Sequence, residues 1–481
     1  MWLGPLRHPS LRGPRCSASA QAPSAPADSG AHQQQQPQAL TWRAAVDFKA
    51  VRDNLEAVRA NCVVRKASVD PAAVVALYEQ YVALKTRTDA VREARNASAA
   101  AVKGAATPEK RNELVAEGKA LKEQLAQLEA ELDAAEVVLQ REGQRLPNAT
   151  HPEVPTGGSE DDFKLLRLVG APRTFEGFAA RDHVALGDAL GLYDFEAASK
   201  ACGSRFVYLK GAAALLELAL IQWAMSRAMA AGFVPFTTPD LVRATCVEKC
   251  GFQPRAENTQ VYSIDGSDLC LTGTAEIPLG GIHMDDTLTE AQLPIKYAAF
   301  GHCFRTEAGA AGAQTRGLYR LHQFSKVELF VLSTPEQSEE IHQQLLDFEV
   351  SLYTELGFHF RVLDMNACDL GAPAYRKFDV EAWMPGMGRF GEISSASNCT
   401  DYQARRLNIR YRPTSGQQAS AAAGKAPLRH VHTLNATACA VPRMIIALLE
   451  THQQADGSVI VPEALRPFLG GMSVISAAGF R

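Results

Sequence analysis

The sequence predicts an α+β fold in which an antiparallel β-sheet flanked by helices follows a long antiparallel two-helix coiled-coil arm. Residues 70–144 carry two long helical patterns with a regular apolar seam. Residues 304–330 carry two strand-like stretches joined by a small-residue loop, the pattern of a hairpin. The chain has 481 residues, of which 46% are hydrophobic, so it is long enough for two or more domains with an ample core.

Charge and cysteine content restrict the class of protein. The net charge is only −4, so any nucleic-acid binding must be local rather than a property of the whole surface. The ten cysteines are scattered, and the closest pair, Cys246 and Cys250, has no second Cys or His pair nearby. A reduced compartment is expected, and a zinc site is not. The most apolar run, residues 212–233, is interrupted by three polar residues, which predicts a buried helix and no membrane span.

The first 40 residues differ in composition from the rest. They hold three arginines, several serines, much alanine and proline, and Asp28 as the single acid. This composition fits an organellar transit peptide better than a secretory signal, which needs an unbroken apolar core. It predicts a location in the chloroplast, the mitochondrion or both. The alternative is an ordinary disordered tail on a cytoplasmic protein.

The arm follows a short helical pattern whose apolar residues are Val46, Phe48, Val51, Leu55 and Val58. One arm helix is predicted from Asp70-Pro71 to about residue 102, and the other from Thr107-Pro108 to about residue 144. Each begins with a capping residue followed by proline. The second helix has an a/d seam made of Leu114, Leu121, Leu125, Leu128, Leu132, Ala135 and Leu139. Two such helices should pack as a coiled coil roughly 45 to 55 Å long.

The tip of this arm is rich in positive charge. Between residues 85 and 111 three acids stand against seven basic residues: Lys85, Arg87, Arg92, Arg95, Lys103, Lys110 and Arg111. A positive tip on a protruding rod suits contact with a phosphate backbone, and duplex RNA is read largely by its shape. The alternative is a solvated coiled coil with a structural or dimerising role.

Residues 304–330 are predicted to form a nucleotide site. By strand alternation Arg305 and Glu307 point to one face of the hairpin. Phe324, Lys326 and Glu328 are expected to point to the same face. An exposed ring can stack on adenine, an arginine can neutralise a phosphate, and a carboxylate can hold an ammonium group. The alternative is a solvated strand pair with salt bridges.

Two other nucleotide motifs are excluded. Residues 386–391 match GxGxxG by letter, but they precede the strand-like residues 392–398 rather than open a helix. No GxxxxGK[ST] sequence occurs, so there is no P-loop. A further helix is expected over residues 334–356. Residues 413–427 are low in complexity and are expected to form a disordered surface loop.

Several stretches resemble the seryl branch of the class II aminoacyl-tRNA synthetases. Residues 304–328, FRTEAG…RGLYRLHQFSKVE, resemble motif 2, and residues 392–406, EISSASNCTDYQARR, are a near-verbatim family signature. Residues 212–239 resemble motif 1, and residues 274–276 match the serine-binding TAE loop. Residues 432–443 resemble motif 3, except that Ala436 and Pro442 stand where glycine is more usual. The proline-broken linker at residues 146–152 also looks like that of the family.

The resemblance implies a class II catalytic domain over residues 156–481, a tRNA-binding arm over residues 41–155 and a presequence over residues 1–40. The expected enzyme is a serine–tRNA ligase that forms seryl-adenylate from L-serine and ATP and transfers serine to tRNA(Ser). Charging of tRNA(Sec) is left open. Motif 1 implies a homodimer. The alternatives are a paralogue that loads a carrier protein, which typically lacks the arm, and a non-catalytic RNA-binding protein with a decayed site.

The resemblance also assigns site residues. Arg305 would contact the α-phosphate and Arg443 the γ-phosphate, and these two are the expected catalytic residues. Serine would be bound by Thr274, Glu276, Arg305, Glu328 and Thr437. ATP would be bound by Arg305, Thr306, Glu307, Arg320, Leu321, Phe324, Glu392, Ile393, Ser394, Ser395 and Arg443. Glu392 and Ser395 offer the hard oxygen ligands that suit Mg²⁺ bound with ATP.

Overall fold

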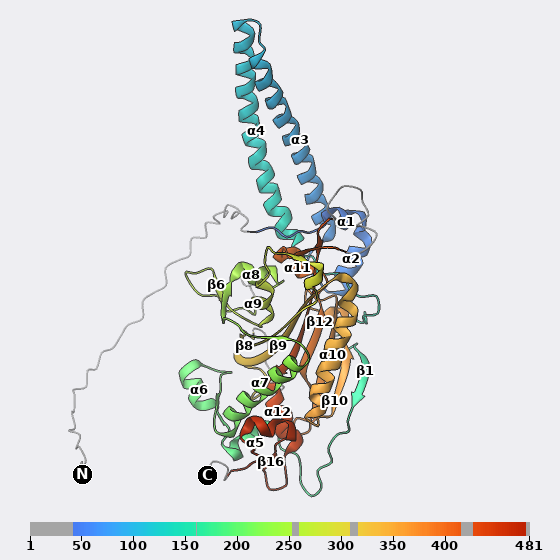
Figure 1. Ribbon diagram of the computed structural model, residues 1–481, viewed down its shortest axis with the longest axis vertical. Helices are drawn as coiled ribbons and strands as arrows, with labels where there is room; N and C mark the ends of the chain where they lie inside the picture. The colour runs from blue at the N-terminus through green and yellow to red at the C-terminus, as the bar shows by residue number, and fades with distance from the viewer. Residues whose placement is uncertain (1–41, 160, 253–258, 308–315, 415–426, 478–481) are drawn as a thin grey trace, which may run out of the picture. The chain divides into compact units, whose positions relative to one another are not determined.

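The computed structural model describes residues 42–159, 161–252, 259–307, 316–414 and 427–477. The predicted presequence and most of the two predicted loops, at residues 308–315 and 415–426, lie outside these ranges. The described chain comprises the helical arm and a mixed body built on a large sheet (Figure 1).

The arm is formed by α3 (Pro71–Lys103) and α4 (Pro108–Gly143), as predicted. Asp70 caps α3 by accepting from the Ala72 N–H, and Thr107 caps α4 by accepting from the Lys110 N–H. Every predicted seam residue of α4 is buried or half-buried, with Leu125, Leu128 and Leu139 almost fully enclosed. The two helices lie side by side along their length (Figure 1). The preceding helical pattern is divided at Asn54 into α1 (Phe48–Asp53) and α2 (Leu55–Val64).

Buried polar contacts hold the base of the arm on the body. The Arg65 guanidinium donates to the carbonyls of Gly371 at 2.7 Å and Ala374 at 2.9 Å. Its burial lowers the pKa of Arg65 to about 10. Asn148 Nδ2 donates to the carbonyls of Pro373 at 2.8 Å and Cys399 at 2.9 Å. The arm is therefore tied to the segment before strand β11 (Arg376–Met384) and to the segment after strand β12 (Arg389–Asn398).

An eight-stranded sheet forms the body, in the order β1-β10-β11-β12-β15-β9-β8-β4. All neighbours are antiparallel except β4 and β8. In that order the strands are β1 (Lys164–Val169), β10 (Phe360–Asp364), β11 (Arg376–Met384), β12 (Arg389–Asn398), β15 (His432–Ala440), β9 (Gln323–Ser333), β8 (Ile295–Phe304) and β4 (Val234–Thr237). The predicted antiparallel sheet is confirmed.

Helices α7 (Ala212–Ala230), α10 (Ser338–Glu355) and α12 (Val441–His452) pack against this sheet. Their contacts enclose large side chains such as Trp223, Tyr353 and Phe360. The predicted buried helix is buried on one face of α7, but the other face is open, since Leu218 is 56% exposed and Met229 is 49% exposed. None of the helices in the described ranges has the length and apolar character needed to cross a membrane.

Smaller elements complete the body. The short helices are α5 (His183–Leu190), α6 (Phe195–Cys202), α8 (Ala244–Lys249), α9 (Glu276–Gly281), α11 (Tyr402–Leu407), and the 3₁₀ turns Glu290–Gln292, Pro335–Gln337, Ala367–Asp369 and Glu463–Leu469. The short strands are β2 (Tyr193–Asp194), β3 (Tyr208–Leu209), β5 (Leu241–Arg243), β6 (Leu269–Leu271), β7 (Thr287–Thr289), β13 (Arg410–Arg412), β14 (Arg429–His430), β16 (Val459–Ile460) and β17 (Val474–Ile475). The GxGxxG letters cover the turn after β11 and the first residues of β12, so they open a strand and not a helix, which agrees with the rejection of a dinucleotide fingerprint.

One strand boundary was predicted wrongly. Strand β8 ends at Phe304, so Glu307 lies beyond it rather than on it. Glu307 has a φ of +48°, a left-handed conformation that turns the chain away from the sheet. Strand alternation therefore does not set the direction of the Glu307 side chain.

Candidate active site

A pocket opens where strands β9, β12 and β15 meet the start of α12. Its lining includes the predicted ATP residues Arg305, Glu307, Arg320, Leu321, Phe324, Glu392, Ile393, Ser394, Ser395 and Arg443. Lys326, Thr437 and Tyr319 line it as well. Residues more than a hundred positions apart in the sequence are thus brought to one cavity.

Strand register gives this pocket its aromatic and charged face. In the β8–β9 pair, Cys303 lies opposite Phe324 and Gly301 opposite Lys326, so Phe324 and Lys326 share a face. Arg305 follows on the same side, and its guanidinium lies 5.3 Å from the centre of the Phe324 ring. Arg305 Nε also donates to the Gly273 carbonyl at 3.2 Å. The predicted pairing of a cation and a ring on one face is confirmed.

Glu307 reaches the pocket despite its left-handed backbone. Its carboxylate accepts from Arg320 at 3.0 Å, and its side chain is only 11% exposed. Leu321, which lies beside Arg320 in the sequence, is buried at the pocket wall. Thr306 is directed away from this group, since its hydroxyl donates to the Thr259 carbonyl at 2.6 Å. The contact supports a role for Thr306 in holding Thr259 against the segment that follows β8.

A second cation enters the pocket from α12. Pro442 falls in the first turn of that helix, where proline is tolerated, so its departure from the family pattern leaves the helix intact. Arg443 then donates to Glu392 Oε2 at 2.9 Å. Burial by itself would raise the pKa of Glu392, but the positive charges of Arg443 and Lys377 outweigh it and lower that pKa to about 2. Glu392 is therefore ionised at neutral pH.

Tyr319 is a site residue that the sequence did not reveal. Its ring lies 4.6 Å from the Arg443 guanidinium and 4.5 Å from that of Arg389. Its carbonyl also accepts from Arg443 Nε at 3.4 Å. Tyr319 stands inside the motif 2 stretch, but a tyrosine between leucine and arginine gives no signal that it will contact arginines from two other elements.

The predicted serine residues lie behind this face and are nearly all buried. Glu328 is 2% exposed and pairs with the Lys326 ammonium, while Thr437 donates to Glu328 at 3.3 Å. Lys326 also donates to the Thr274 hydroxyl at 3.0 Å. Burial raises the pKa of Glu328, although Lys326 opposes that shift. Lys326 thus links two predicted serine residues, a role that the sequence did not assign to it.

Glu276 is the second buried carboxylate of this cluster. It is 7% exposed, and it accepts from Gln403 at 2.5 Å and from Asn435 at 3.0 Å. Burial and the neighbouring Glu328 carboxylate raise the pKa of Glu276 to about 7. Neither amide was predicted as a site residue, although Gln403 stands inside the family signature and Asn435 inside motif 3.

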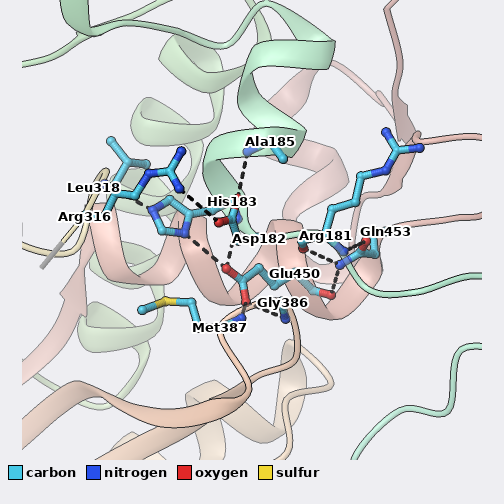
Figure 2. Close-up of polar contacts among 10 residues, drawn as sticks. All are labelled: Arg181, Asp182, His183, Ala185, Arg316, Leu318, Gly386, Met387, Glu450 and Gln453. Carbon is cyan, nitrogen blue, oxygen red and sulfur yellow. Dashed lines mark hydrogen bonds and ion pairs between the residues drawn. The ribbon is translucent and has the colours of Figure 1, made fainter. Parts of the chain in front are cut away.

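A buried polar network joins the segments that carry the ATP residues (Figure 2). The Glu450 carboxylate accepts from the backbone and ring N–H groups of His183 at 2.9 and 3.1 Å. Its other oxygen accepts from the N–H groups of Gly386 at 2.9 Å and Met387 at 3.1 Å. His183 Nε2 accepts from the Leu318 N–H at 3.3 Å. Four segments are thereby fixed together: α5, α12, the β11–β12 turn and the middle of motif 2.

Replacing Glu450 with glutamine should loosen the ATP residues. One acceptor oxygen becomes an NH₂ group facing backbone N–H donors, and an unpaired buried donor costs about 1 to 3 kcal/mol. We expect a lower melting temperature and a KM for ATP raised about tenfold, because Leu318 and Arg443 both rest on this network. Thermal unfolding and nucleotide kinetics measure the two effects. The exposed Glu463→Gln variant is the control, and an unchanged KM for ATP would contradict the argument.

The predicted tRNA-binding residues are not part of the pocket. All seven lie on α3 and α4, between the middle of α3, where Lys85 and Arg87 stand, and the first turn of α4. Arg92 is paired with Asp89 at 2.6 Å and Glu129 at 2.9 Å, and Lys110 is paired with Glu113 at 3.0 Å. Within the described ranges no ion pair is made by Lys85, Arg87, Arg95, Lys103 or Arg111. These five leave their charge available to an anionic partner.

Known protein families match both the helical arm and the body of the chain. A model of the class II core domain of tRNA synthetases (G, H, P, S and T) matches residues 260–452, and a model of the seryl-tRNA synthetase N-terminal domain matches residues 46–150. The chain is 46% identical to a serine–tRNA ligase of Treponema denticola, over 88% of this chain and 99% of the relative. It is also 46% identical to one of Rubrobacter xylanophilus, over 88% and 98%.

Solved structures give the same result. A seryl-tRNA synthetase from Pyrococcus horikoshii, crystallised with ATP, superimposes with a TM-score of 0.82 at 36% identity, covering 90% of this chain and 99% of that one. A cytoplasmic serine–tRNA ligase from Naegleria fowleri, in complex with AMP, gives 0.78 at 27% identity, covering 90% and 98%. The chain therefore belongs to the seryl-tRNA synthetase family of class II aminoacyl-tRNA synthetases, a family of serine–tRNA ligases.

Proposed function

We propose that this chain activates L-serine with ATP, giving seryl-adenylate and pyrophosphate, and then transfers serine to the 3′ end of tRNA(Ser). The observation that carries the proposal is a cavity lined by two arginines, with two buried carboxylates next to its lining residues Lys326 and Thr437. Arg305 and Arg443 suit the phosphates of ATP. Glu276 and Glu328 suit the ammonium and hydroxyl groups of serine.

The first step joins two anions, the serine carboxylate and the α-phosphate. Such a step needs charge neutralisation and alignment more than a covalent nucleophile. We assign Arg305 to the α-phosphate and the serine carboxylate, since its guanidinium lies over the Phe324 ring and its charge acts on both buried carboxylates. Adenine would stack on Phe324, with Glu307 and the Leu321 backbone at its edge. Arg443 would bind the γ-phosphate.

Magnesium fits this site through Glu392 and Ser395. Glu392 keeps its negative charge because Arg443 and Lys377 hold its pKa low, and its side chain is 41% exposed. Ser395 lines the same pocket. An ionised carboxylate and a hydroxyl are hard oxygen ligands, which Mg²⁺ prefers. The ion would supply charge neutralisation for the phosphates of ATP.

The same proposal assigns the rest of the chain. Residues 41–155 would bind tRNA through the tip of the arm, and residues 156–481 would form the catalytic domain. The exposed apolar side chains of α7 and β4 support a homodimer: Leu215, Leu218, Met229 and Val234. The composition of residues 1–40 supports import into the chloroplast or the mitochondrion. Charging of tRNA(Sec) stays open.

Serine-dependent ATP–pyrophosphate exchange tests the activation step, and charging of tRNA(Ser) tests the transfer. Exchange should be observed with serine and not with other amino acids, and charging should follow when tRNA is added. The absence of exchange with every amino acid would overturn the proposal. Exchange without charging would confine the chain to adenylate formation.

Replacing Glu276 with alanine should impair the use of serine far more than the binding of ATP. The change removes a buried acceptor and leaves the amides of Gln403 and Asn435 without their partner. We expect kcat/KM for serine to fall about 10²- to 10³-fold, while the KM for ATP stays within about threefold. The two substrates are varied separately in the exchange reaction. Equal losses for both would count against the assignment.

A further inference from the structure

The carboxylate of Glu276 is held at one oxygen by two neutral amides. Gln403 Nε2, from α11, donates to Oε1 at 2.5 Å, and Asn435 Nδ2, from β15, donates to the same oxygen at 3.0 Å. Both amides are buried, Gln403 completely. Among the residues that the structure describes, no donor reaches Oε2 of Glu276. That oxygen is available to a ligand.

The Gln403 amide has a single satisfactory orientation. Its nitrogen faces the Glu276 carboxylate and also the Cys250 carbonyl, at 3.2 Å, and both of these groups only accept hydrogen bonds when the carboxylate is ionised. Its oxygen therefore faces Thr433, whose hydroxyl donates to it at 2.7 Å. A rotated amide would place its oxygen against the carboxylate. Thr433 thus fixes Gln403, and Gln403 fixes Glu276.

The available oxygen lies beside the second carboxylate of the pocket. Asn435 and Thr437 are two residues apart on β15, so their side chains share a face about 7 Å apart. Asn435 donates to Glu276 and Thr437 donates to Glu328. A small amino acid between the two carboxylates would thus have Glu328 on one side and Glu276 on the other. Lys326 already lies against Glu328.

The partners of the two carboxylates differ in charge. Glu328 has a cationic partner in Lys326, whereas the hydrogen-bond partners of Glu276 are neutral. The charged groups that face Glu276 are Glu328, Lys326 and Arg305, with the thiols of Cys250 and Cys399 nearby. A neutral amide can hold a carboxylate in place without cancelling its charge. The oriented oxygen of Glu276 therefore stays a strong acceptor for a hydroxyl group.

We propose that Gln403, oriented by Thr433, is a specificity-determining positioning residue that aims the second oxygen of Glu276 at the hydroxyl group of serine. The inference rests on the proposed function and deepens it. Alanine has the same backbone groups but cannot donate to this oxygen, so the selection of serine over alanine depends on how well Glu276 is held. A site that reads a hydroxyl rejects the analogue that lacks it far more strongly than a site that reads only size.

The test compares the full chain with its Gln403→Met and Thr433→Val variants, in exchange assays with serine, with alanine and with varied ATP. Gln403→Met keeps the length of the side chain and removes its donors. We expect the KM for serine to rise about 10- to 100-fold, as for the loss of a hydrogen bond to a charged group. The kcat/KM for alanine and the KM for ATP should stay within about twofold, so the preference for serine falls by the same factor. Thr433→Val should act in the same direction, by about 3- to 10-fold.

Gln140→Met is the matched control, because Gln140 is a buried glutamine whose amide contacts the Ala44 backbone at the base of the arm. It should leave the KM for serine unchanged. A Gln403 variant that raises the KM values of serine and ATP equally would overturn the inference. If Gln403→Met does not fold, Thr433→Val decides alone, and an unchanged selection of serine over alanine in that variant overturns it.

The pH dependence gives a readout that a loss of packing would not move. A hydrogen bond donated to the ionised carboxylate favours ionisation, and Gln403 opposes the effect of burial on the pKa of Glu276. Without Gln403 that pKa should rise, so the acidic limb of kcat/KM for serine should move to higher pH. An unmoved limb would contradict the inference. A wild-type chain without serine-dependent exchange would instead refute the proposed function itself.

Discussion

Replacing Arg305 with alanine is expected to lower serine-dependent ATP–pyrophosphate exchange about 10³-fold, mainly through kcat. Arg305 faces both the nucleotide pocket and the buried carboxylates, since it packs on the Phe324 ring and its charge, with that of Lys326, opposes the rise that burial causes in the pKa values of Glu276 and Glu328. Its loss leaves the approach of two anions without neutralisation. It should also raise the pKa of both carboxylates, because a positive neighbour has been removed.

The conservative variant Arg305→Lys should recover part of this loss. Lysine keeps the charge but cannot present the planar guanidinium that stacks on Phe324 and donates to the Gly273 carbonyl. The exposed Arg59→Ala variant, on α2, is the control for removing one arginine. Full activity of Arg305→Ala would show that the phosphates are neutralised elsewhere in the pocket.

Neutralising the tip of the arm should abolish most tRNA charging and leave activation unchanged. We would replace four exposed basic residues with glutamine: Lys85, Arg87, Lys103 and Arg111. Each makes no ion pair within the described chain, so its charge is available to RNA phosphates. We expect kcat/KM for tRNA to fall about 10²-fold and its dependence on salt to weaken by about one slope unit for each residue that contacts a phosphate.

Exchange assays without tRNA provide the internal reference for this variant, because the activation pocket lies in the body. A matched variant carries the same number of changes away from the tip, at Lys49, Arg59, Arg141 and Lys200. Equal losses of charging in the two variants would show that net charge, rather than the tip of the arm, governs tRNA binding. A loss of exchange in the tip variant would point to a folding defect.

Much of the fold and of the candidate site could be predicted from the sequence, because the sequence patterns that predict them are local. The arm could be predicted to within two residues, since capping residues, prolines and an apolar seam each act over one or two helical turns. The face shared by Phe324 and Lys326 followed from strand alternation, which depends only on position parity, whereas the place of Arg305 beside Phe324 also depends on the register of β8 and β9. Short stretches that resemble the sequence motifs of the family indicated which residues to assign to ATP and to serine.

Other features could be determined only from the tertiary structure. The exposed side of α7 could not be predicted from a run with only a few polar residues, and the left-handed conformation of Glu307 could not be predicted from a strand-like stretch. Tyr319, Lys326 and Gln403 act through partners on distant elements. The contact between Gln403 and Glu276 spans 127 residues.

The sequence by itself determined the fold class, the arm and the chemical types of residue in the pocket. Local propensity, hydrophobic periodicity and sequence motifs carry that information. Only the tertiary structure decided which carboxylate is paired with a cation and which is held by amides. It also decided that Glu392 stays ionised while the pKa of Glu276 rises to about 7. Burial and the sign of the neighbouring charges set these properties, and both depend on the packing of strands β9, β12 and β15 with helices α9, α11 and α12.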